Sequence, residues 1–211
     1  MLKLGLTGGI ASGKSLVGEM FVQLGAHLIQ SDAVAHRLRE PGQPVYEKIV
    51  AAFGPGILDP DKTINRSKLA EAAFGAEHRV KELNDIVHPA VIAYENQWME
   101  EIAARDPKSI AIVEAALILE ANAAGRFDYL IVVTCREDQR IERVAKRLGI
   151  SKEAAKAEVA RRMAAQWPDE KKIQAADFVI DNSGTTEQAN RQVQAFYAKL
   201  IHPQSGDSQH S

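Results

Sequence analysis

The chain has 211 residues, 45% of them hydrophobic and 26% charged, with a formal net charge of −2. This length and composition predict a globular core domain that can carry insertions, and the small net charge gives no indication of a nucleic-acid or membrane partner. No apolar run approaches the roughly 20 residues of a membrane-spanning helix, and the first residues lack a signal-peptide layout. The single cysteine, Cys135, excludes an internal disulfide. We therefore expect a cytoplasmic protein without nucleic-acid or membrane partners.

The first elements predicted along the chain are a strand, a helix and a second strand. Residues 2–6 (LKLGL) form the short apolar run of a buried strand. Residues 14–25 have helical periodicity that ends at Gly25, and residues 26–30 (AHLIQ) form a second strand candidate.

A long segment with an almost wholly helical pattern follows. It runs from Asp32 to about Asp106, which is too long for an ordinary connection in a compact domain. We expect a helical insertion that is broken at three places: residues 40–44 (EPGQP), 54–61 (GPGILDPD) and 87–89 (VHP).

The remaining elements alternate again. Residues 109–115 and 128–135 are short and rich in Ile and Val, as buried strands are, and residues 137–175 look helical. Residues 176–182 are predicted as the last strand and residues 185–201 as the last helix. Strands separated by helices predict an α/β fold, a parallel sheet with helices on both faces.

The turn after the first strand carries a phosphate-binding motif. Residues 8–15 (GGIASGKS) match the pattern G-x-x-x-x-G-K-[ST] between a predicted strand and a predicted helix. Backbone N–H groups of such a loop and of the helix N-terminus face the phosphates, the lysine adds a positive charge, and the last hydroxyl binds Mg²⁺. We therefore expect a nucleoside triphosphate and Mg²⁺ here; the alternative is a glycine-rich turn without a ligand. The residues expected at the nucleotide are Gly8, Gly9, Ala11, Ser12, Gly13, Lys14, Ser15 and Leu16.

The rest of the sequence favours a small-molecule kinase over a nucleotide-gated switch. No N-K-x-D guanine-reading motif occurs anywhere in the chain. Residues 136–172 hold 11 Lys and Arg against 7 Asp and Glu, a net charge of +4 that suits a lid over a transferring phosphoryl group. Arg143 and Arg147 share a helix face that Arg136 and Arg140 extend. A solvated helix whose arginines pair with nearby acids is an equally good interpretation of this segment.

Two acids follow predicted strands at the edge where open α/β sheets bind ligands. Asp32 lies after the second strand, where it could accept a proton from a hydroxyl, orient that hydroxyl, or cap the next helix. Glu114 ends the strand IAIVE and resembles the acid that orients Mg²⁺ in the second nucleotide motif; the alternative is an ordinary acid at a strand end.

From Leu4 to about Val193 the chain resembles the dephospho-CoA kinase family. Its opening LTGGIASGKS resembles the family's opening L-T-G-G-I-x-S-G-K-S, with Ala11 at a position that is often glycine. IQSDAVAHR resembles I-D-A-D-x-x-A-R, with Gln30 at the first aspartate and Asp32 at the second. EAALILE resembles D-x-P-L-L-F-E, with Glu114 at the leading acid and Ala116 at the proline. The other stretches that carry the resemblance are EPGQPVYEKIVAAFGPGILDPDKTINRSKL, VHPAV, RIERVAKRLGIS, RRMAAQ and KIQAADFVIDNSG.

The resemblance implies a fold of the P-loop kinase type and ATP-dependent phosphorylation of the ribose 3′-hydroxyl of dephospho-CoA, the last step of coenzyme A synthesis. It implies that Asp32 is the base and that Arg147 and Arg143 close over the phosphoryl group. It also places Asn182 at the nucleotide and Arg66, His88 and Arg162 at the substrate. The implied parts are a nucleotide-binding core (residues 1–31, 107–135 and 176–202), an insertion that binds the CoA moiety (32–106), a lid (136–175) and a disordered tail (203–211).

Overall fold

The structure is a computed structural model that describes residues 1–74 and 77–202, so the tail predicted at 203–211 lies outside the described residues. Its strands are β1 (Leu2–Gly8), β2 (His27–Gln30), β3 (Ile110–Glu114), β4 (Tyr129–Thr134) and β5 (Phe178–Asp181). Its α-helices are α1 (Lys14–Gln23), α2 (Ser31–Arg37), α3 (Pro44–Phe53), α4 (Arg66–Phe74), α5 (Glu77–Arg105), α6 (Glu137–Leu148), α7 (Lys152–Ala164), α8 (Asp169–Gln174) and α9 (Thr186–Ile201). Two short 3₁₀ helices are η1 (Pro55–Ile57) and η2 (Ala124–Arg126).

The chain divides into two compact units. The first contains residues 1–28 and the chain from residue 105 onward, and the second contains residues 29–104. The second unit is a continuous piece of sequence between two parts of the first. In neither unit does a described helix have the length and apolar character needed to cross a bilayer.

The five strands form one sheet in the order β2-β3-β1-β4-β5. β1 pairs in parallel with β3 and β4, and β4 pairs in parallel with β5. Every residue of β3 is buried, as the continuous apolar run of a strand covered on both faces requires. The α/β fold expected from the alternation of strands and helices is confirmed.

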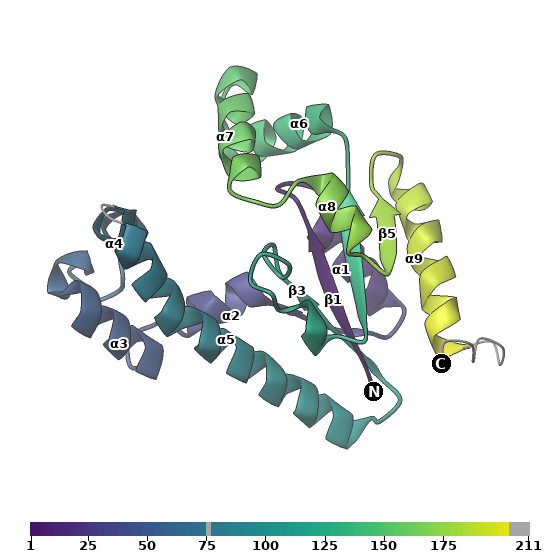
Figure 1. The fold of residues 1–211 in the computed structure, drawn as a ribbon, viewed down its shortest axis with the longest axis horizontal. Coiled ribbons are helices and arrows are strands. Elements are labelled where there is room, and N and C mark those ends of the chain that lie inside the picture. The colour runs from purple at the N-terminus through teal and green to yellow at the C-terminus, as the bar shows by residue number, and fades with distance from the viewer. Residues whose placement is uncertain (75–76, 203–211) are drawn as a thin grey trace. The chain divides into compact units, whose positions relative to one another are not determined.

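Helices cover both faces of the sheet in the first unit. α1 and α9 pack against one face, where Val17, Phe21 and Val193 meet Leu6 and Ile131 in the main core cluster (Figure 1). The other face is covered by the segment after β3, which includes η2, and by Trp167 just before α8. This layering leaves the carboxyl ends of the strands, where the β1–α1 turn lies, as the edge that can receive a ligand.

The second unit has a helical core of its own. Its buried residues Val45, Ile49, Ile57 and Leu69 come from α3, η1 and α4, and α5 packs against them. The expected interruptions at residues 40–44 and 54–61 are present, because α2, α3 and α4 end or begin at them.

The third expected interruption, at residues 87–89, is wrong. α5 continues through Pro89 to Arg105 and is one unbroken helix in Figure 1. A proline inside a helix lacks one N–H and crowds the carbonyl four residues earlier. Here Leu83, Ile86, Val87 and Ala90 all pack on the core of the unit, and this packing on both sides of Pro89 outweighs the local penalty.

Candidate active site

The β1–α1 turn has the geometry of a phosphate-binding loop. Gly13, the residue before α1, has φ 96° and ψ 25°, a left-handed conformation that glycine adopts without strain. A Cβ atom at Gly13 would lie 2.0 Å from Nδ2 of Asn182, so the close approach of Asn182 also requires a glycine. Both the backbone bend and the space around it explain why a glycine precedes Lys14.

Side chains donate hydrogen bonds to the carbonyl oxygens of this loop. Lys14 Nζ donates to the carbonyls of Gly8 (3.1 Å) and Gly9 (3.3 Å). Arg143 Nη1 donates to the carbonyls of Ala11 (3.0 Å) and Ser12 (3.1 Å). Asn182 Nδ2 also donates to Ser12 O, at 2.9 Å. Carbonyls that are held in this way leave the N–H groups of the loop free to face an anion.

The structure shows the surroundings of Ala11, which departs from the family pattern, and of Leu16, which is also expected at the nucleotide. Ala11 has φ 53°, a left-handed conformation that costs an alanine roughly 1 kcal/mol more than a glycine. Leu16 points away from the loop and lines a hollow of about 230 Å³ with residues of α1 and the start of α9. Its side chain therefore takes no part in holding phosphates, and only its backbone can.

An oxygen-rich pair lies where the sequence predicts Mg²⁺. Ser15 Oγ donates to Glu114 Oε1 at 2.9 Å, and Glu114 is buried at the end of β3. A hydroxyl and a carboxylate are suitable ligands for Mg²⁺, which in kinases takes its other ligands from phosphates and water. Within residues 1–74 and 77–202 no group of three or more His, Cys, Asp or Glu could hold a metal ion.

The four arginines of the predicted lid face have different surroundings. Arg136 is exposed and bonds Asp138 and the carbonyl of Ser183. Arg140 is 1% exposed and forms an ion pair with Asp169. Arg143 contacts the loop and the carbonyl of Asn182. Arg147 is exposed in the last turn of α6.

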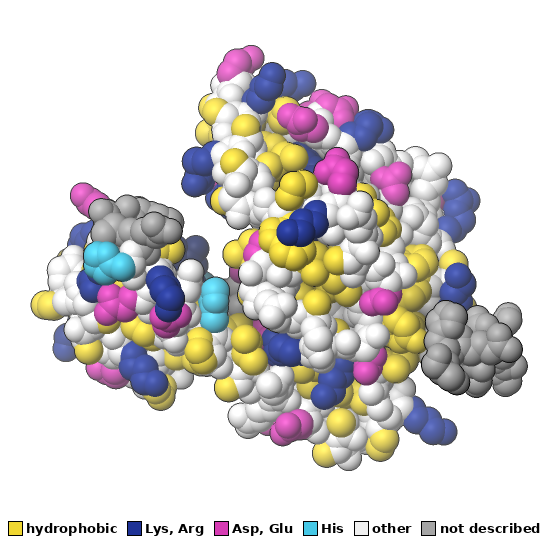
Figure 2. Space-filling model, viewed as in Figure 1, with side chains coloured by type: hydrophobic (Ala, Val, Ile, Leu, Met, Phe, Trp, Pro, Cys, Tyr) yellow, Lys and Arg dark blue, Asp and Glu magenta, His cyan; other side chains and the backbone are white. Residues whose placement is uncertain are grey.

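Acids accompany the basic side chains over much of α6 and α7 (Figure 2). Glu142 pairs with Lys152, and Glu158 pairs with Arg161 and Arg162. Hydrogen bonds from these two arginines lower the pKa of Glu158 to about 2. Arg162 is thus held on the surface of α7 by a neighbouring acid, while Arg147 has no hydrogen bond or ion pair within the described part of the chain.

α8 contributes two ion pairs to the first unit that sequence reasoning missed. Arg140 of α6 meets Asp169 at the start of α8, and Lys172 Nζ lies 3.0 Å from Glu120 Oε1. The side chains of Arg140 and Lys172 are almost completely buried. Helical periodicity placed Arg140 on one face with Arg143 and Arg147, but periodicity does not tell which part of a face is covered.

Asp32 lines a cavity of about 570 Å³ within the second unit. The capping role considered for Asp32 is wrong, because α2 begins at Ser31, Gln30 precedes it, and Asp32 lies in the first turn. Ser31 Oγ instead donates to Glu95 Oε1 at 2.5 Å. Asp32 is therefore available to the cavity rather than used by the backbone of its helix.

Two arginines face the same cavity. Arg66, at the start of α4, and Arg39, after α2, both line it together with His36. Burial and the positive charge of Arg66 lower the pKa of the Arg39 guanidinium, and Asp32 opposes this shift. Arg39 Nε donates to the carbonyl of Ala35 at 2.7 Å. Arg39 was not among the residues singled out in the sequence, and its contribution depends on the fold of α2 against α4.

The apolar part of the cavity comes from α4 and α5, with Leu69, Ala73, Val80 and Leu83 in its wall. His88 is exposed on α5 and is not among the residues that line it. The cavity thus combines one carboxylate and two guanidinium groups with an apolar wall, a combination suited to an anionic ligand with an apolar portion.

Comparison with known proteins adds to this geometry. A parallel sheet with a phosphate loop between its central strand and the following helix defines a protein of the P-loop kinase type. A shikimate kinase from Acinetobacter baumannii has the same fold, with a TM-score of 0.50 at 11% identity over 98% of this chain and 96% of its own.

A family model described as dephospho-CoA kinase matches residues 2–188. The chain belongs to the dephospho-CoA kinase family. A dephospho-CoA kinase from Geobacillus kaustophilus is 41% identical over 92% of this chain and 94% of its own. A solved structure of TT1252 from Thermus thermophilus is similar, with a TM-score of 0.77 at 31% identity over 94% of this chain and 97% of its own. A dephospho-CoA kinase from Campylobacter jejuni has a TM-score of 0.68 at 26% identity, over 95% of this chain and 98% of its own.

Proposed function

We propose that the protein transfers the γ-phosphoryl group of ATP to the ribose 3′-hydroxyl of dephospho-CoA, giving ADP and coenzyme A. The observation that carries this assignment is the family match over residues 2–188, which takes in the phosphate loop and the whole helical unit. A relative such as the Geobacillus kaustophilus protein shares this range at 41% identity. A cytoplasmic location and the absence of nucleic-acid or membrane partners stay predictions.

The donor side of the reaction belongs to the phosphate loop. The amide groups from Gly8 to Ser15 bind the β- and γ-phosphates, and Lys14 moves from the loop carbonyls to the phosphates when ATP enters. Ser15 and Glu114 hold Mg²⁺, supported by their 2.9 Å hydrogen bond. When bound, the metal neutralises charge on the phosphates. Asn182 supports the loop, because its side-chain amide donates a hydrogen bond to Ser12 O.

The acceptor side belongs to the helical unit of residues 29–104. Asp32 accepts the proton of the 3′-hydroxyl as that oxygen forms its bond to the γ-phosphorus and the bond to the β-phosphate oxygen breaks. Arg66 and Arg39 bind the pyrophosphate of dephospho-CoA, a role supported by their shared cavity. The apolar wall of α4 and α5 suits the pantetheine portion. His88 and Arg162 stay proposed substrate contacts on the family resemblance alone.

Residues 136–175 form the lid in this proposal. Arg147 is the arginine best able to reach the transferring phosphoryl group, because it is exposed at the end of α6 and makes no hydrogen bond or ion pair among the described residues. Arg143 supports the loop and assists Arg147. Closure of the lid keeps water from accepting the phosphoryl group.

The test is ADP formation with Mg·ATP and four acceptor conditions: dephospho-CoA, adenosine, AMP and no acceptor. We expect turnover with dephospho-CoA alone, with coenzyme A as the product. A nucleotide-gated switch would release ADP slowly whatever the acceptor, and a nucleotide or sugar kinase would turn over with another acceptor.

Asp32→Asn separates the proposed base from a structural role. The amide keeps the shape of the side chain but cannot accept a proton, so kcat should fall about 10²-fold or more while ATP affinity stays within about two-fold. An unchanged kcat would remove Asp32 from the mechanism.

A further inference from the structure

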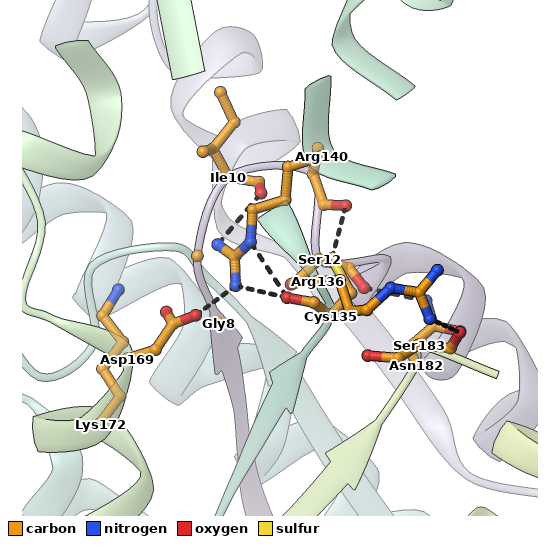
Figure 3. A network of polar contacts seen from close by, with 12 residues as sticks. Gly8, Ile10, Ser12, Cys135, Arg136, Arg140, Asp169, Lys172, Asn182 and Ser183 are labelled. Carbon is orange, nitrogen blue, oxygen red and sulfur yellow. Dashed lines mark hydrogen bonds and ion pairs between the residues drawn. The ribbon is translucent and has the colours of Figure 1, made fainter. Parts of the chain in front are cut away.

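An ion pair with a buried arginine contacts the phosphate loop. Arg140 projects from α6 and Asp169 begins α8, and their side chains are 1% and 26% exposed. Figure 3 shows the guanidinium group of Arg140 between Ile10 of the loop and Asp169. Asp138, in the first turn of α6, bonds Arg136.

The guanidinium group lies against Gly9 and Ile10 of the loop and also contacts Cys135, just after β4. Nη1 donates to the carbonyl of Ile10 at 3.4 Å, while Nε and Nη2 both lie 3.4 Å from the carbonyl of Cys135 at the end of β4. A Cβ atom at Gly9 would lie 2.0 Å from Nη1 of Arg140 and 3.2 Å from Oδ1 of Asp169. The pair therefore fills the space that glycine leaves at this position.

The Ile10 carbonyl completes the pattern found elsewhere in the loop. The carbonyls of Gly8 and Gly9 bond Lys14, and those of Ala11 and Ser12 bond Arg143. Arg140 supplies the donor for the one loop carbonyl between these two sets. The Ile10 side chain is held as well, because it packs with Val144 of α6 in a small apolar cluster.

The chemistry of the pair also points to positioning. A buried guanidinium group loses its hydration, and an apolar pair of similar volume is often at least as stable as a buried ion pair. An apolar pair lacks the rigid, planar set of N–H donors with which a guanidinium group bonds a carbonyl. Lys14 differs from Arg140 in this respect, because Lys14 must leave its loop carbonyls to reach phosphate, whereas Arg140 can stay.

We propose that Arg140 and Asp169 are positioning residues for the phosphate loop. Arg140 holds the Ile10 carbonyl outward so that the neighbouring amides face the phosphates, and Asp169 fixes the guanidinium group and ties the loop to α8. The inference rests on the proposed function only in taking adenine nucleotides as the ligand of the loop. Neither residue is assigned contact with the reacting atoms.

The decisive variant is the double substitution Arg140→Met with Asp169→Leu. It replaces the ion pair with apolar side chains of similar size, so no buried charge is left unpaired. Thermal unfolding should stay near that of the wild type, and ADP affinity by calorimetry should weaken at least about five-fold through the lost carbonyl contact. Val193→Ala, in the α9 core, is the control for a general loss of stability and should leave ADP affinity unchanged.

A second variant covers the case in which the double variant does not fold. Arg140→Lys keeps a charge beside Asp169 but has no planar fork to reach Ile10 O and Cys135 O as well. Its ADP affinity should also weaken at least about five-fold. A smaller change in the folded double variant, or in Arg140→Lys if only that variant folds, overturns the proposal. Because ADP binding needs no acceptor, this result is separate from any failure of the dephospho-CoA assignment.

Discussion

Arg39 and Arg66 line one cavity together with a single carboxylate, that of Asp32. Burial and the charge of Arg66 both lower the pKa of Arg39, so the free protein holds two guanidinium groups in mutual repulsion. An anion bound between them relieves this repulsion and gains charge-assisted hydrogen bonds. At the scale of single residues, this repulsion is the main support for the proposal that the phosphates of the acceptor bind here.

Arg39→Met should therefore weaken binding of the acceptor and leave binding of the nucleotide unchanged. Loss of hydrogen bonds to a charged group costs about 1.5–3 kcal/mol, which corresponds to a rise of roughly 10- to 150-fold in KM for dephospho-CoA. Arg37→Met is the matched control on the same stretch of chain, because Arg37 bonds Tyr94 and does not line the cavity. Equal effects of the two substitutions on KM would contradict the assignment.

Single residues also show where sequence reasoning succeeds and fails. The phosphate loop was predictable because its pattern is local and Gly13 meets a backbone requirement that only glycine satisfies easily. The capping role of Asp32 was misjudged by two positions, since Gln30 precedes the helix and Ser31 is used by Glu95. Arg39 was missed because its neighbour in space, Arg66, is far away in sequence.

Among the elements, α6 carries arginines that differ in how deeply they are buried. Arg140 is buried against the loop, Arg143 bonds loop carbonyls, and Arg147 is exposed. A helical pattern predicts that these side chains share a face, but the packing of the loop and α8 against that face decides which of them are buried. Of the two alternatives for this segment, paired acids are observed for Lys152, Arg161 and Arg162, and the lid stays a prediction.

Arg147→Ala should lower kcat about 10²-fold or more and change ADP affinity by less than about three-fold, because its contact is proposed for the transition state. Lys146→Ala, a neighbouring exposed cation in the same helical turn, controls for the loss of one positive charge. The kcat of each variant should be measured at saturating dephospho-CoA, and its ADP affinity should be compared with that of the wild type. An equal loss in kcat and in affinity would make Arg147 a ground-state binding residue.

α5 carries a proline that its tertiary packing tolerates. Pro89→Ala restores an N–H to the helix and removes the clash with the carbonyl of Asp85, so it should stabilise the protein by up to about 3 kcal/mol. Thermal unfolding monitored by circular dichroism measures the change. Glu100→Ala, at an exposed position of α5, should shift stability by less than about 0.5 kcal/mol. Destabilisation by Pro89→Ala would mean that this region of the helix depends on the proline.

For the whole molecule, the division into two units assigns the phosphate loop and the arginine-lined cavity to different units. The phosphate loop belongs to the unit of residues 1–28 and 105 onward, and the arginine-lined cavity belongs to residues 29–104. The alternation of strands and helices predicted the first unit well, because each strand is short and apolar. The second unit was predictable as helical, but its cavity arises from contacts among α2, α4 and α5 that no local pattern contains.

Hydrogen exchange should map the two ligands onto the two units. ADP should slow exchange mainly in β1, the loop and the first turn of α1, and coenzyme A should slow it mainly in α2 and α4. Both ligands are products, so no turnover complicates the measurement. Protection by coenzyme A confined to the first unit would contradict the proposed acceptor site.

The buried thiol of Cys135 gives this protein an internal probe of loop opening. Burial raises the pKa of the thiol, and the positive charges of Arg140 and Arg143 only partly oppose this effect; its Sγ lies 3.7 Å from the carbonyl of Ala11. Alkylating reagents react with thiolates that they can reach, so modification requires the loop to move away. As Cys135 is the only cysteine of the chain, the rate of alkylation reports on one site, and its slowing by nucleotide would give the amount by which nucleotide raises the free energy of loop opening, without an engineered probe.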